Sequence, residues 1–225
     1  MDGDNIIHLQ ERRNARLTIH DAGDDVGLPP PRGWLLENQF CREFVSSVVG
    51  AGQAGKTALR IAQLLSAATL RPLTGQHVFV RCRVLLVSLE DNVDEIQRRI
   101  AAAVLHHNIS RANLKDWFFY TTPPKGIKLA ELINGSRQRG DLELALRDAI
   151  MELKPDIVCL DPFVKTHALV ENDNGAMDYV CDLLAGFADE FKIAVDAPHH
   201  TRRALPRLAT PTWGAAPAAS RMPAA

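Results

Sequence analysis

The chain has 225 residues, of which 46% are hydrophobic and 24% charged, as in an ordinary globular protein. Its 26 Lys and Arg residues balance 27 Asp and Glu residues, which excludes binding to nucleic acid through overall positive charge. No apolar run approaches the roughly 20 residues of a membrane span, and the polar N-terminus lacks the apolar core of a signal peptide, so we expect a cytoplasmic protein with no membrane contact.

Three segments of different character follow one another. Residues 1–33 are polar and end in Pro29-Pro-Pro-Arg-Gly33, which predicts an arm or linker. Residues 34–203 have the patterns of a folded core, and residues 204–225 form a tail rich in Ala, Pro and Arg. The four cysteines are widely spaced, so we expect reduced thiols, three of them in or near the core.

Strands and helices are expected to alternate through the core. Apolar runs predict strands at 44–49, 83–88, 117–120, 156–160 and 192–195. Helical spacing predicts helices at 57–70, after an Asn92/Glu95 capping box, from an Asp141 cap to about 153, and after the loop 171–175. Residues 123–140 contain several Pro and Gly residues and are expected to be a loop. The alternation predicts an α/β fold with a mostly parallel sheet flanked by helices.

A phosphate-binding loop is the most specific motif. Its pattern is GxxxxGK[ST], placed between a strand and a helix as that motif requires, and its residues are Gly50, Ala51, Gly52, Gln53, Ala54, Gly55, Lys56 and Thr57. Backbone N–H groups and the helix N-terminus would hold the phosphates of ATP, Lys56 would reach the β and γ phosphates, and Thr57 would bind Mg²⁺. The alternative is a Gly-rich turn that merely joins strand to helix.

Two carboxylates follow neighbouring apolar strands. Asp161 ends the strand Ile157–Leu160, and we expect it to hold Mg²⁺ through water; otherwise it is an acidic cap on a loop. Glu90 follows the strand 83–88, and we expect it to polarise the attacking water; Glu90 or Asp91 could instead serve the next helix N-terminus.

Two histidines stand at the expected carboxyl end of the last strand, in Ile193-Ala-Val-Asp-Ala-Pro-His-His200. A histidine there could donate a hydrogen bond to the γ-phosphate and lose it on hydrolysis. Adjacent residues on a strand point to opposite faces, so only one of the pair could do so. The alternative is an exposed pair with no role.

The order GxxxxGKT, SLED, LDPF, ENDNGA and HHT resembles the RepA-like ATPases of the RecA superfamily, which occur on plasmids, phages and integrated elements. The likeness runs from about Trp34 to Thr201. It implies a RecA-like sheet, with Glu90 as the catalytic glutamate, Asp161 as the Walker B aspartate and His200 as the γ-phosphate sensor.

The same resemblance implies a ring, usually of six subunits, with ATP between neighbours and an arginine supplied across the interface. Arg202 and Arg203 follow the histidines, but neither can be matched to that arginine. The leading hypothesis is a Mg²⁺-dependent ATPase of the replicative helicase type that moves single-stranded DNA. The alternatives are an ATP-dependent switch or loader that does not translocate, and a nucleotide-binding remnant that lacks its C-terminal strands.

The tail interrupts the family pattern. Residues 204–225 have no period of 2 or 3.6 where a RecA-like sheet should continue, which leads to the hypothesis of a frameshifted, disordered tail. The alternative is a short protein with a disordered end. The gene decides: a stop codon soon after Thr201 in the alternative frame would exclude the frameshift.

Overall fold

The computed structural model describes residues 18–24 and 27–201, which fall into two units divided between Pro31 and Arg32. The described part of the first unit contains no helix or strand. The proposed tail, Arg202 and Arg203 lie outside the described residues. In the part of the chain that is described, no helix is long and apolar enough to cross a membrane.

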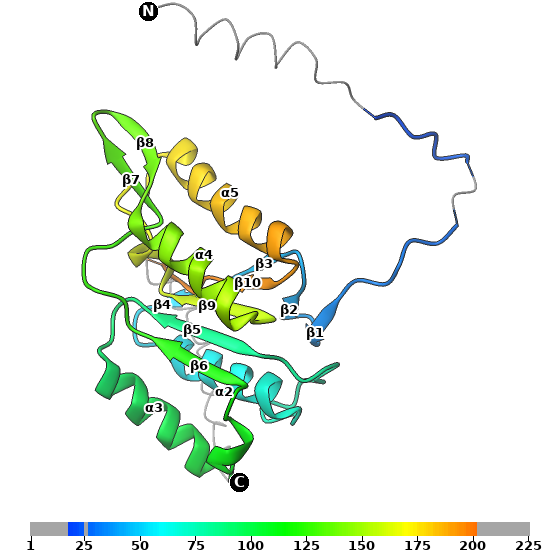
Figure 1. Cartoon of the computed structure of the whole chain (residues 1–225), viewed down its shortest axis with the longest axis vertical. Helices are drawn as coiled ribbons and strands as arrows, with labels where there is room; N and C mark the ends of the chain where they lie inside the picture. Colours follow the sequence, from blue (N-terminus) through cyan, green and yellow to red (C-terminus); the bar gives the residue numbers. More distant parts are fainter. Residues whose placement is uncertain (1–17, 25–26, 202–225) are drawn as a thin grey trace, which may run out of the picture. The chain divides into compact units, whose positions relative to one another are not determined.

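The second unit is built on a five-stranded sheet in the order β3-β10-β9-β5-β6, in which every pairing is parallel (Figure 1). Its strands are β3 (Val45–Ser46), β10 (Ala194–Asp196), β9 (Ile157–Asp161), β5 (Val84–Ser88) and β6 (Phe118–Thr121). Three two-stranded sheets accompany it: β1 (Trp34–Leu36) with β2 (Phe40–Cys41), β4 (Val49–Ala51) with β11 (His199–Thr201), and β7 (Ala130–Ile133) with β8 (Ser136–Arg139).

Helices cover both faces of the five-stranded sheet. The helices α2 (Lys56–Thr69) and α3 (Val93–His106) lie on one face, and α4 (Asp141–Leu153) and α5 (Asn174–Phe191) on the other (Figure 1). Side chains of β5 alternate accordingly: Val84 and Leu86 join the core under α2 and α3, whereas Leu85 and Val87 join the core under α4 and α5. This arrangement confirms the expected α/β fold. Two short 3₁₀ helices, η1 (Arg111–Asn113) and η2 (Phe163–Lys165), complete the described elements.

Two expected strands are each interrupted. The strand expected at 44–49 is divided into β3 and β4, and the run that ends in the histidines is divided into β10 and β11. Both breaks fall at the same level, and the pairing keeps one register across them, with partners 150 residues apart. Pro198 has no N–H for the ladder, which accounts for the break on that side. The histidines therefore lie on a second short strand, and the expectation of one continuous strand was wrong.

Two further expectations need correction. Residues 123–140 are not all loop, because β7 and β8 form a hairpin there. Its two-residue turn, Asn134-Gly135, has positive φ at both positions (52° and 77°), which is the turn that suits the twist of a hairpin. The cap of α4 is Gly140, and Asp141 lies in the first helical turn.

The Asn92 cap is confirmed: its side chain accepts a hydrogen bond from the Glu95 amide. The Glu95 carboxylate does not complete the capping box but accepts from Arg98 and Arg99. Cys41, Cys82 and Cys159 are buried and Cys181 is exposed, as expected for three cysteines in or near the core.

Candidate functional site

The phosphate-loop motif forms a tight turn between β4 and α2. Gln53 and Gly55 both have left-handed backbone conformations, with φ of 62° and 84°. Gly55 stands at the N-cap of α2, where no side chain caps the first turn. The first N–H groups of a 14-residue helix are therefore left to an outside acceptor, the arrangement with which helices bind phosphate.

Lys56 begins that helix and turns back over the loop. Its side chain is buried, and its ammonium group donates to the carbonyl oxygens of Gly50 (2.7 Å) and Ala51 (2.6 Å). The ammonium group of Lys56 therefore has two hydrogen-bond acceptors within its own loop. A phosphate that binds Lys56 has to compete with them.

Asp161 ends β9 and lies in register with Ser88 at the end of β5. Its carboxylate is buried and interacts with the side chain of Thr57. Burial raises the pKa of Asp161, and the Thr57 side chain opposes that shift. The last residue of the phosphate loop and the predicted metal aspartate are therefore in direct contact.

Glu90 and His200 face each other across the mouth of the site. His200 Nε2 lies 3.9 Å from Glu90 Oε2, too long for a hydrogen bond but close enough for an ion pair when the imidazole is protonated. His199 points elsewhere: its ring meets the edge of Phe163 at 5.4 Å between centroids. As expected from strand geometry, only one histidine of the pair faces Glu90.

A polar cavity of about 540 Å³ joins these groups. The phosphate loop, Glu90 and His200 line it together, so most of the predicted site residues meet around one space. Asp161 does not line it but interacts with Thr57, which does. A larger cavity of about 750 Å³ lies between α4 and the β5–β6 face, but no charged residue lines it. The polar cavity is lined by the phosphate loop itself, which makes it the candidate site for phosphates.

Sequence reasoning missed Arg99, which also lines the polar cavity. Its Nε atom lies 3.2 Å from Asp91 Oδ2 and 3.1 Å from Glu95 Oε1. The four-residue spacing of Glu95 and Arg99 was the available signal, because such residues share one face of a helix.

Among residues 18–24 and 27–201, no three His, Cys, Asp or Glu side chains gather to hold a metal ion. A Mg²⁺ site of the phosphate-loop kind needs fewer protein ligands, because phosphate oxygens and water complete the octahedron. The hydroxyl of Thr57 and the neighbouring carboxylate of Asp161 fit that requirement.

Comparison with known families gives a match to the AAA domain over residues 10–204, most of the chain. The chain belongs to the AAA domain family. This is a family of P-loop ATPases, and with the five-stranded parallel sheet it makes the fold RecA-like. No curated protein was found to match the chain with significant similarity.

Proposed function

We propose that this AAA domain protein binds ATP with Mg²⁺ in the polar cavity and hydrolyses it. The observation that carries the proposal is the convergence of the phosphate loop, Glu90 and His200 on one space, with Asp161 next to Thr57 of that loop. The Gly-rich-turn alternative does not account for that convergence, because a mere turn has no need of a carboxylate and an imidazole opposite it.

The residues divide the work of binding. The free N–H groups at the start of α2 receive the phosphates, and Lys56 exchanges its carbonyl partners for phosphate oxygens. Thr57 and Asp161 hold Mg²⁺, the aspartate through water. When bound, Mg²⁺ neutralises phosphate charge and orients the phosphates.

Glu90 and His200 are assigned to the chemical step. Glu90 is largely exposed to the cavity, so its carboxylate can orient a water molecule and accept its proton. His200, in register with Gly50 of the phosphate loop, donates a hydrogen bond to the terminal phosphate and loses this contact after hydrolysis.

Lys56→Ala tests the binding proposal. Charge-assisted hydrogen bonds contribute about 1.5–3 kcal/mol each, so ATP affinity measured by calorimetry should fall more than about tenfold. Lys115→Ala, at an exposed lysine outside the cavity, is the matched control and should bind ATP like the wild type. Unchanged affinity in Lys56→Ala would exclude the phosphate-loop assignment.

At a finer level, the resemblance to RepA-like ATPases supports a role in replication of a mobile element, as a ring-shaped helicase that moves single-stranded DNA. Stimulation of ATP hydrolysis by single-stranded DNA tests this. If the rate of ATP hydrolysis does not change when DNA is added, the switch or loader is favoured. ATP binding without hydrolysis or assembly favours the nucleotide-binding remnant.

A further inference from the structure

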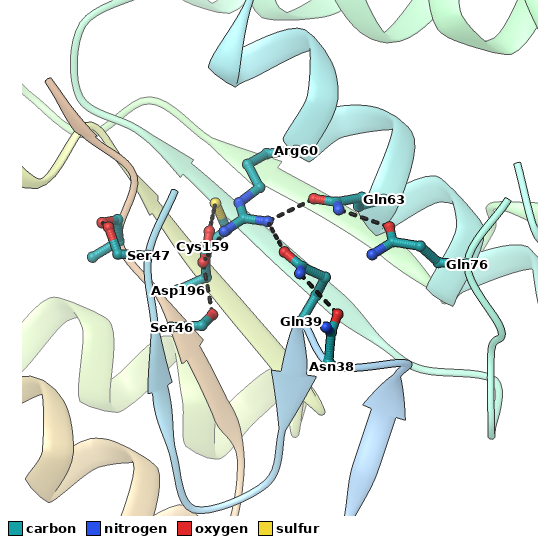
Figure 2. Close-up of polar contacts among 10 residues, drawn as sticks. Asn38, Gln39, Ser46, Ser47, Arg60, Gln63, Gln76, Cys159 and Asp196 are labelled. Atoms are coloured by element: carbon teal, nitrogen blue, oxygen red, sulfur yellow. Dashed lines mark hydrogen bonds and ion pairs between the residues drawn. The ribbon is translucent and has the colours of Figure 1, made fainter. Parts of the chain in front are cut away.

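A buried ion pair joins the phosphate-loop helix to the strand that leads to His200. Arg60 of α2 and Asp196 of β10 lie 2.8 Å apart, with side chains that are 1% and 0% exposed (Figure 2). Arg60 stands one helical turn after Lys56 on the same buried side of α2. A contact that fixes Arg60 therefore also fixes the rotation of α2 that places Lys56.

Asp196 contacts three elements of the site at once. Besides Arg60, it accepts hydrogen bonds from Ser46 Oγ of β3 (2.7 Å) and from Cys159 Sγ of β9 (3.5 Å). Ser46 precedes the phosphate loop, and Cys159 stands two residues before Asp161. One carboxylate thus ties together the elements that carry Lys56, the phosphate loop and Asp161, and its own strand continues to His200 (Figure 2).

Arg60 is held from the other side as well. Its Nη1 atom donates to Gln63 Oε1 (2.6 Å) and Gln39 Oε1 (3.2 Å), and its guanidinium lies over the Phe40 ring. Its Nε atom is buried without a partner in the described part of the chain. Removing two charges completely from water costs free energy. A well-packed apolar pair of similar volume therefore often stabilises a fold as much as a buried ion pair does. Stability alone therefore does not account for the pair.

We propose that Arg60 and Asp196 are positioning residues that hold the phosphate loop, Asp161 and His200 at one fixed separation. The proposal rests on the proposed function of the cavity. Neither side chain lines the cavity, so both act through the residues that they hold. Asp196 is the last residue of β10, just before the breaks in β3–β4 and β10–β11, so the pair lies where the five-stranded sheet meets the β4–β11 ribbon.

The test uses the double variant Arg60→Met/Asp196→Asn. Asp196→Asn alone leaves a buried guanidinium without its counter-charge and is expected to unfold the chain. The double variant removes both charges, keeps an acceptor for Ser46 and preserves side-chain volume. Its melting temperature should stay near that of the wild type, while KM for ATP should rise because the pair also fixes the rotation of α2 that places Lys56. Misplacement of reacting groups by about 1 Å costs roughly 100-fold, so kcat should fall about 10- to 100-fold.

Arg42→Met/Asp156→Asn is the matched control. It removes the same residue types by the same substitutions from an ion pair at the opposite, amino-terminal end of the strands. Its kcat should equal that of the wild type. An equal loss of kcat in both double variants, or none in Arg60→Met/Asp196→Asn, would overturn the positioning role.

Hydrogen exchange gives a readout that needs no nucleotide. In Arg60→Met/Asp196→Asn, amides of the β4–β11 ribbon, such as His199 N–H bonded to Val48 O, should exchange about tenfold faster, while β5 amides keep their protection. Unchanged exchange in the ribbon would also overturn the proposal. A wild type that binds no ATP would instead refute the proposed function, and the exchange result would still decide whether the pair positions the ribbon.

Discussion

The Lys56 ammonium group bridges two carbonyl groups of its own loop. Binding of ATP therefore exchanges one set of charge-assisted hydrogen bonds for another, and the net gain is smaller than the strength of the new bonds. The same bonds keep the loop curled before a phosphate arrives, so less ordering is left to the moment of binding.

Glu90→Gln separates binding from chemistry at a single residue. The amide keeps the size of the side chain but cannot accept a proton from water, so ATP turnover should fall about 10²- to 10⁴-fold while the dissociation constant for ATP changes little. Phosphate release and calorimetry measure the two quantities. Glu152→Gln, on the exposed side of α4, is the control. Wild-type turnover in Glu90→Gln would mean that this residue serves only the start of α3.

The four thiols should differ sharply in reactivity. Burial raises the pKa of Cys82 to about 12 and that of Cys159 well above the usual value, so neither forms a thiolate at pH 8. Cys181 is exposed, but burial of part of the group and the carboxylates of Asp178 and Asp182 raise its pKa too. We expect iodoacetamide to label Cys181 first and slowly in the folded protein, and all four thiols after unfolding. Peptide mass spectrometry reads the order; rapid labelling of Cys82 in the folded state would contradict it.

At the scale of elements, two glycines at helices predict opposite outcomes. Gly140 is buried at the cap of α4, and a Cβ there would clash with the Lys128 carbonyl, which accepts the Leu142 amide. Gly140→Ala should therefore lower the free energy of unfolding by about 1–3 kcal/mol.

Gly186 is the control, exposed within α5 with open space where a Cβ would stand. Gly186→Ala should raise the free energy of unfolding by about 0.5–1 kcal/mol, because alanine loses less backbone entropy in a helix. Urea unfolding followed by circular dichroism measures both. Equal effects of the two substitutions would contradict the packing at Gly140.

The elements that the sequence predicted well are those with a local signal. Apolar runs marked β5 and β9, and helical spacing marked α2 to α5, because both patterns reflect burial of one or both faces. The hairpin β7–β8 also had a local signal, the Asn134-Gly135 turn, which was outweighed by the surrounding Pro and Gly residues. The breaks in the two strands had only Pro198 as a local sign.

The site residues also fall into those that the sequence could predict and those that it could not. The phosphate loop, Glu90, Asp161 and His200 each end or follow a strand, and carboxyl ends of parallel strands meet at one edge, so their convergence could be predicted. The Arg60–Asp196 contact could not, because it joins residues 136 positions apart and depends on how α2 packs on the sheet. An ion pair between two such distant residues leaves no recognisable motif in the sequence.

At the scale of the whole molecule, the proposed ring predicts a change of mass with nucleotide. Glu90→Gln should retain ATP unhydrolysed, so light scattering after size exclusion with ATP and Mg²⁺ should give about six times the mass of one chain (24.8 kDa) if the family's usual ring forms. The same sample without nucleotide is the control. A single-chain mass in both conditions would refute ring assembly under these conditions and favour the remnant.

The paired breaks in β3–β4 and β10–β11 have a mechanical consequence. Beyond these breaks, the phosphate loop begins on β4 and His200 lies on β11, and these two strands are hydrogen-bonded to each other. A movement of either strand therefore moves the other. Ser47 Oγ spans the joint by donating to the Ala197 carbonyl. A displacement of the phosphate loop would then rotate the β4–β11 ribbon as one unit about the Ser47–Ala197 contact, while the five-stranded sheet stays fixed.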